Sequence, residues 1–167
     1  MKAWVAALLA AFSCLAAAQG FPSKPIRILV PFPPGGGTDV AARALAEHLQ
    51  RDLGQPVLVD NRSGGNSVIA TEAAARAEPD GHTLLLTTDF HSINAAFGLR
   101  LPYDSLADFA FVSRVSALKG TEVPARLAGA GVDAAPSTPE ELEQWVREDI
   151  ARYRRIIELT GAKPDGR

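Results

Sequence analysis

The residues best suited to bind a ligand lie at positions 35 to 39, where three glycines precede a threonine and an aspartate. The triplet stands between the apolar run Ile26 to Val30 and a helical pattern that begins at Thr38. Ordering three glycines costs conformational entropy, so a triplet at this junction requires a reason. At a helix N-terminus the free backbone N–H groups and the helix dipole favour an anion, and glycines let the backbone approach it closely. The pattern therefore indicates a backbone site for an anionic group.

Two further loops are also rich in small or polar residues that could bind a ligand. Arg62 to Ser67 is rich in glycine and small polar side chains, and Thr87 to Ser92 carries small hydroxyl side chains beside an aspartate and a histidine. Apolar runs alternate with helical patterns here, which is typical of βαβ units. Loops that follow parallel strands meet outside the carboxyl ends of those strands, where open α/β sheets bind ligands. The sequence predicts an α/β fold, a mostly parallel sheet with flanking helices, from strands at 26–30, 57–59 and 83–88 and helices at 38–53 and 67–77.

The glycine triplet does not match the common nucleotide-binding motifs. Gly37 is followed by Thr38 and Asp39 rather than by the lysine of a P-loop. The spacing of Gly35 and Gly37 also lacks the third small residue of a dinucleotide fingerprint, because Val40 occupies that position. We therefore expect neither a nucleotide nor another cofactor at this turn.

The sequence supports a catalytic site or a metal site less well than an anion site. Asp89 and His91 could form an acid–base pair, although two polar residues in a loop are more often part of a turn. Three histidines and one cysteine are too few and too scattered for a metal site. We expect His48 to pack on an apolar helix face and His82 to be exposed, and we expect no catalytic or metal-binding residue.

The composition is that of a globular domain, with 47% hydrophobic and 22% charged residues among 167. The formal net charge of −2 gives no reason to expect nucleic acid or an anionic membrane surface as a partner.

Residues 1–18 have the pattern of a secretory signal peptide. Lys2 supplies a positive charge, the apolar stretch from Trp4 to Leu15 is too short to span a bilayer, and three alanines then offer a cleavage site. Lipidation of Cys14 is the alternative, but the residues before it lack the leucine of a bacterial lipoprotein signal. Cleavage would remove the one cysteine, so no disulfide is expected. We expect a periplasmic protein that does not insert into the membrane after cleavage.

The last part of the chain predicts one long amphipathic helix. Thr138 to Glu141 is a capping box with proline at the first helical position, and Gly161 ends the pattern. Such a helix needs an apolar surface to cover, and the exposed sheet is the surface we expect; a coiled-coil seam is the alternative. Its apolar stripe comprises Leu142, Trp145, Val146, Ile150, Tyr153, Ile156 and Ile157.

The chain resembles the Bug family of periplasmic solute-binding receptors of tripartite tricarboxylate transporters. The resemblance runs from Phe21 to Val115 through the motifs PGGGTD, LGQPV, the NR–GG pair, PDG and LPYD…DF, and the C-terminal segment is also similar. It implies a two-lobed receptor that closes around a small carboxylate or dicarboxylate and delivers it to integral membrane transporter subunits. Asp39 is expected to act as an N-cap and dipole partner more than as a direct anion contact, because two negative groups repel. The ligand-binding residues carried over from the family are Phe32, Gly36, Gly37, Thr38, Asp39, Thr88 and Ser92.

The chain is considerably shorter than the members of this family. We divide it into a first lobe at 19–115, a junction of an apparent internal deletion at 116–121, and a C-terminal segment at 122–167 that packs on the first lobe. Most of the second lobe would then be missing, and ligand capture would be impaired. A single-lobe interaction or sensory module without solute binding is the alternative.

Overall fold

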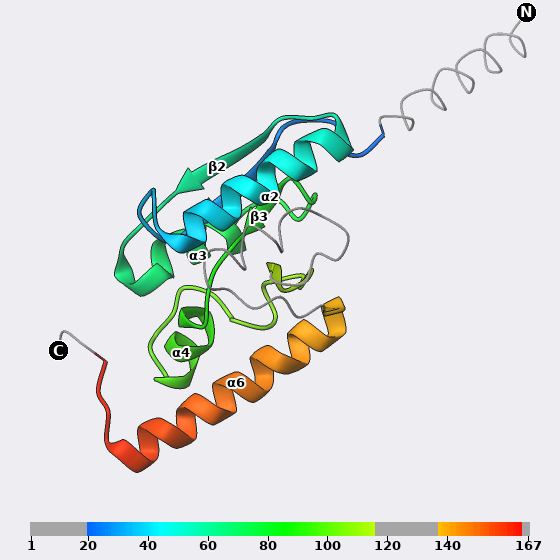
Figure 1. Cartoon of the computed structure of the whole chain (residues 1–167). Helices are drawn as coiled ribbons and strands as arrows, with labels where there is room; N and C mark the ends of the chain where they lie inside the picture. Colours follow the sequence, from blue (N-terminus) through cyan, green and yellow to red (C-terminus); the bar gives the residue numbers. More distant parts are fainter. Residues whose placement is uncertain (1–19, 116–136, 165–167) are drawn as a thin grey trace, which may run out of the picture.

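A computed structural model of the chain describes residues 20–115 and 137–164. The predicted signal peptide and the 116–121 junction lie outside these residues. Three parallel strands form one sheet in the order β2-β1-β3: β1 spans Ile26–Val30, β2 spans Val57–Asn61 and β3 spans Thr83–Leu85. The predicted α/β fold with a parallel sheet is confirmed (Figure 1).

The core of the sheet is built around its central strand. Four of the five residues of β1 are buried, and Arg27 alone is exposed. Such a continuous apolar run is typical of a parallel strand that is covered on both faces. Helix α2 (Gly37–Leu53) contributes Ala42 and Ala46 to the core cluster, where they lie with Ile28 and Val30. Small side chains on the helix let it approach the sheet closely.

The connections after β2 and β3 differ from the predicted boundaries. A 3-10 turn, η1 (Gly65–Ser67), precedes helix α3 (Val68–Ala75), which is shorter than the predicted 67–77. β3 ends at Leu85 rather than at Thr88, and a short helix, α4 (Phe90–Ala96), begins inside what the sequence suggested was a loop. The third strand-to-helix connection is therefore shorter than expected.

The long C-terminal helix α6 (Pro139–Thr160) has the predicted extent, and Gly161 closes it in a left-handed conformation. Its position corrects our expectation, because α6 packs on α4 rather than on the sheet (Figure 1). α2 and α3 contact the strands, whereas α4 offers the small residues Ala95 and Ala96 as a surface for the larger side chains of α6. The second cluster consists of Ala95, Ala96, Leu106, Phe111, Leu142, Trp145, Val146, Ile150, Tyr153 and Ile157.

The start of α6 carries the predicted capping box. The backbone N–H of Glu141 donates to Thr138 Oγ1 at 3.2 Å, and the backbone N–H of Thr138 donates to Glu141 Oε2 at 2.8 Å. We expect Thr138→Ala to lower the free energy of unfolding by about 1 kcal/mol, because the backbone N–H of Glu141 loses its acceptor. Urea denaturation measures this change. Thr138→Ser keeps the hydroxyl and should retain most of the stability; an equal loss in both variants would contradict the capping role.

Candidate functional site

Three segments that follow the strands meet at one edge of the sheet, and we call them the carboxyl-edge site: residues 32–39, 62–67 and 87–92. The side-chain amide of Asn61, the last residue of β2 before the second segment, donates to the carbonyl oxygen of Phe32 in the first segment at 3.0 Å. The rings of Phe32 and Phe90 lie 6.0 Å apart and join the first and third. Asn94 Nδ2 donates to the Asn66 carbonyl oxygen at 2.7 Å, which links α4 to the second. The predicted convergence of the three loops is therefore confirmed.

The glycine triplet makes the turn from β1 into α2. Gly35 has a φ of 86°, a left-handed conformation that favours glycine, and its N–H donates to Asp39 Oδ2 at 2.9 Å. Gly36 is the N-cap, and the first helical bond runs from the Val40 N–H to the Gly36 carbonyl oxygen at 3.0 Å. The N–H groups of the first turn, at residues 37 to 39, thus have no acceptor within the helix. Gly36 and Gly37 are exposed, so an anion can approach these amides from solvent.

Asp39 has a different position from the one we expected. It is the third residue of α2 rather than its N-cap, and only 2% of it is exposed. Its carboxylate accepts hydrogen bonds from Gly35 N, Arg43 Nε and Asn61 Nδ2, each at 2.9 Å. The Arg43 guanidinium, the Gly35 N–H and the Asn61 amide together lower the pKa of this carboxyl to about 2. Asp39 therefore joins β2 to the glycine turn, and its oxygens already have donors from the protein.

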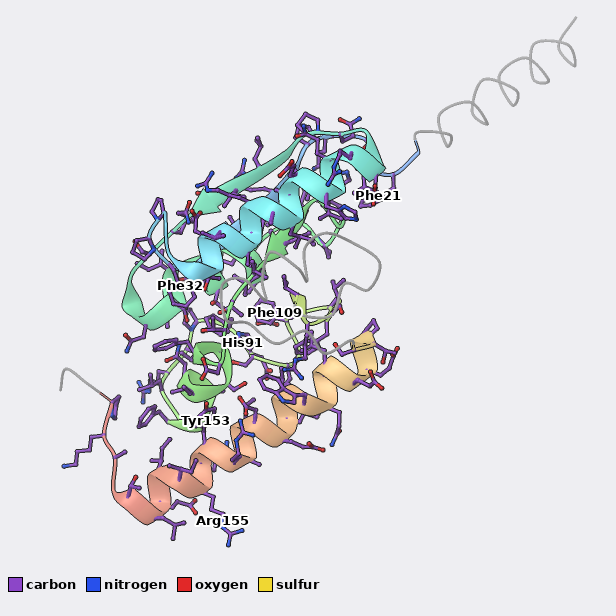
Figure 2. The ribbon with its side chains drawn as sticks, viewed as in Figure 1. Phe21, Phe32, His91, Phe109, Tyr153 and Arg155 are labelled. Carbon is purple, nitrogen blue, oxygen red and sulfur yellow. The ribbon has the colours of Figure 1, made fainter. Side chains whose placement is uncertain are left out.

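The remaining predicted site residues differ in their access to solvent. Phe32 and Thr38 are half-buried, and Thr88 is exposed. Ser92 is 1% exposed on α4, so Thr88 is the more accessible hydroxyl of the third segment. Figure 2 shows Phe32 near the start of α2, on the side that faces α4.

Asp89 and His91 do not form an acid–base pair with each other in this arrangement. His91 is 5% exposed, and its Nε2 lies 2.8 Å from the Ser105 carbonyl oxygen. Its ring stacks on Tyr103 with centroids 6.2 Å apart, and burial lowers its pKa. Asp89 instead accepts a hydrogen bond from the Tyr153 hydroxyl at 2.9 Å, so α6 holds the third segment of the carboxyl-edge site.

The cationic side chains beside the site are already paired. Arg43 binds Asp39, and Arg62 binds Asp60 with 3.0 Å between Nη2 and Oδ2. Within residues 20–115 and 137–164, no group of three metal-ligating side chains occurs. Positive potential at the carboxyl-edge site therefore comes from backbone amides and the α2 dipole, which favour an anion.

Three residues that organise the site were not predicted from the sequence as site residues. Arg43 stands four residues after Asp39, a spacing that brings two side chains together on one helix face. Asn61 is the last residue of β2, where side chains reach the sheet edge. Tyr153 gave no signal, because its partner Asp89 lies 64 residues earlier in the chain.

A separate hollow of about 590 Å³ lies beyond the C-terminal end of α4. Tyr103 and Ser105 form part of one wall, and Ile150 and Arg154 of α6 form part of another. It contains none of the predicted ligand-binding residues. In the described part of the chain, no helix is both long enough and apolar enough to cross a membrane.

Residues 41–123 match the family model described as "Tripartite tricarboxylate transporter family receptor". Protein BugT of Bordetella pertussis is 51% identical over 102 residues, which cover 59% of this chain and 31% of that protein. A protein encoded in the TAR-I ttuE-ttuC' intergenic region of Agrobacterium vitis is 34% identical over 149 residues, which cover 89% of this chain and 41% of that protein.

Solved structures of periplasmic binding proteins are also similar to part of this chain. The periplasmic binding protein BugD superposes with a TM-score of 0.53 at 35% identity, over 56% of this chain and 31% of that one. MatC from Rhodopseudomonas palustris, with bound malate, superposes with a TM-score of 0.52 at 35% identity, over 57% of this chain and 33% of MatC. The chain thus spans about a third of the length of these relatives. The chain belongs to the TctC/Bug family of periplasmic solute-binding proteins, which are receptors rather than enzymes.

Proposed function

We propose that this chain binds a small carboxylate or dicarboxylate at the carboxyl-edge site. The observation that carries the proposal is the first turn of α2, where Gly36 and Gly37 are exposed at the edge where three loops converge. The N–H groups at residues 37 to 39 have no acceptor within the helix. The other residues that we assign to the site are Phe32, Thr38 and Thr88, together with Ser92 on α4. Malate bound to the relative MatC supports the choice of ligand class.

The proposed binding is weak, because the described residues supply contacts from one side only. Binding pockets bury about 70–90% of the surface of a small ligand, and immobilising the ligand costs nearly the same whether or not it is enclosed. A single lobe that keeps half the interaction energy of a micromolar receptor would bind at about millimolar concentration or more weakly. The chain would thus be a receptor of a tripartite tricarboxylate transport system with impaired ligand capture.

The cellular setting follows from the same proposal. Residues 1–18 would direct export to the periplasm, where residues 19–115 would form the ligand-binding lobe and 122–167 would be the C-terminal segment after the 116–121 junction. Integral membrane subunits of the transporter would be the protein partners. Closure around the ligand, which is the usual signal of a two-lobed receptor, requires a second lobe and a hinge.

Gly37 offers a direct test, because a proline there removes one N–H group without disturbing the helix. Gly37 is the first helical residue, where proline is favoured, and Gly36 has the extended φ of −76° and ψ of 167° that a residue before proline adopts. We expect Gly37→Pro to weaken malate binding about tenfold, since one charge-assisted hydrogen bond is lost.

Gly37→Ala is the matched control for this measurement. It keeps the N–H, and a Cβ at this position has nothing within 4 Å. Calorimetry with malate and succinate should therefore give similar affinities for Gly37→Ala and the unchanged protein. Equal affinity of the proline variant, or no binding of either acid to the unchanged protein at about 10 mM, would refute the proposal.

A further inference from the structure

The N-terminal segment before β1 is fastened to a turn before β3, at the edge of the sheet opposite to the carboxyl-edge site. Phe21 lies against His82 with ring centroids 4.9 Å apart, and Ser23 N donates to His82 Nε2 at 3.2 Å. Lys24 Nζ lies 2.7 Å from Asp80 Oδ2. We call these residues and Gly81 the N-terminal clasp. In Figure 2, Phe21 lies far from Phe32, near the other end of α2.

His82 is at the centre of the clasp, and its burial corrects our expectation that it is exposed. Only 7% of the residue is accessible to solvent. Phe21 covers the turn so closely that a Cβ on Gly81 would lie 3.0 Å from its ring. The burial could not be predicted locally, because the covering segment comes from 59 residues earlier in the chain.

The hydrogen bonds of the clasp define the protonation state of the imidazole. A backbone N–H can only donate, so Nε2 must accept from Ser23 and carries no proton. Nδ1 lies 3.0 Å from the Asp80 carbonyl oxygen, which can only accept, so Nδ1 carries the proton. His82 is therefore neutral in this arrangement, as the Nδ1–H tautomer.

Protonation of Nε2 would place two N–H donors against each other. The hydrogen bond from Ser23 would be lost, and that N–H would remain beside a cation. Since this bond attaches the N-terminal segment to the turn, its loss loosens the segment while the strands keep their own hydrogen bonds.

The charged groups around His82 keep their charge over the range in which an imidazole titrates. Asp80 Oδ1 lies 3.3 Å from Nδ1, and Lys24 together with the backbone N–H of His82 lowers the pKa of Asp80 to about 2. Asp80 and Glu78 raise the pKa of Lys24, which is paired with both. On β1, the backbone N–H of Arg27 donates to the His82 carbonyl oxygen at 2.8 Å.

We infer that His82 is a pH-sensitive latch: the neutral imidazole holds the Ser23 amide, and the protonated imidazole loosens the N-terminal segment. This inference is independent of ligand binding, because the clasp and the carboxyl-edge site lie at opposite edges of the sheet.

NMR on the full chain tests the latch. We expect the imidazole nitrogen shifts of His82 to report the Nδ1–H tautomer at pH 8. As His82 titrates, the hydrogen-exchange protection of the Ser23 amide should fall about tenfold, because one hydrogen bond is lost. The protection of Val30, at the other end of β1, should stay constant. His48, which pairs with Asp52 on α2, serves as a reference histidine.

The matched variant is His82→Gln, whose side-chain oxygen accepts a hydrogen bond at any pH. Ser23 protection in this variant should not change between pH 5 and pH 8. A fall in this variant equal to that of the unchanged protein would overturn the latch, as would constant protection in the unchanged protein. If the His82→Gln variant does not fold, the imidazole nitrogen shifts of the unchanged protein still test the inference. An Nε2–H tautomer of His82 at pH 8 would overturn it.

Discussion

Replacing Asp39 by alanine is expected to lower the free energy of unfolding by about 3 kcal/mol, because three donors lose one ionised acceptor. The Gly35 N–H, the Asn61 amide and the Arg43 guanidinium all point at this buried carboxylate. The substitution should also loosen the glycine turn, since Gly35 is held by this contact. Urea denaturation at pH 7 measures the loss.

Asp52→Ala is the control for this prediction. Asp52 lies on the same helix, its side chain is 60% exposed, and its ion pair is with His48. An exposed pair of this kind contributes about 0–1 kcal/mol. An equal loss in the two variants would contradict the organising role of Asp39.

The stability that Asp39 provides should depend on pH in a defined direction. Its pKa of about 2 in the folded chain lies below the ordinary aspartate value of 3.8, so ionisation stabilises the folded state at neutral pH. Protonation removes this contribution as the pH falls from about 4 towards 2. Asp39→Ala should therefore differ from the unchanged protein most strongly above pH 4 and converge with it in stronger acid.

The second large effect is expected at the contact between α4 and α6. Ile150 is 9% exposed in the cluster that joins these helices, and Ile150→Ala should cost about 2–4 kcal/mol through lost burial and the cavity it leaves. Because α6 also holds Asp89 through Tyr153, hydrogen exchange should increase in the segment from Thr87 to Ser92.

Ile156→Ala provides the matched comparison on the same helix. Ile156 is 45% exposed, so its truncation should change the stability by less than about 1 kcal/mol. Thermal and urea unfolding of both variants check the difference. A larger loss at Ile156 would mean that the apolar stripe of α6 faces another surface.

Local patterns in the sequence were sufficient to predict the central strand of the sheet and both ends of α6. The β-branched run from Ile26 to Val30 forms the buried central strand, and Thr138 and Gly161 mark the ends of α6. The convergence of three loops at one edge also followed from the sequence, because parallel strands leave no other arrangement for their carboxyl ends.

Contacts between distant segments could not be predicted in this way. α4 is one short helix of seven residues, too short for a clear apolar period, and it forms the surface on which α6 packs. Asp39 has the residue type of an N-cap, yet its carboxylate is held inside the site by a hydrogen bond from Asn61, which lies on β2 and is distant in the sequence. Burial of His82 likewise depends on Phe21, which arrives from the N-terminal segment.

The central claim is that backbone amides at the start of α2 bind a carboxylate. The most direct measurement is a titration of the nitrogen-15-labelled chain with malate, followed through the amide resonances of Gly37, Thr38 and Asp39. We predict saturable shifts at these three amides, with a half-point at about millimolar malate. No shift at these amides, or shifts confined to the hollow between Tyr103 and Ile150, would contradict the claim.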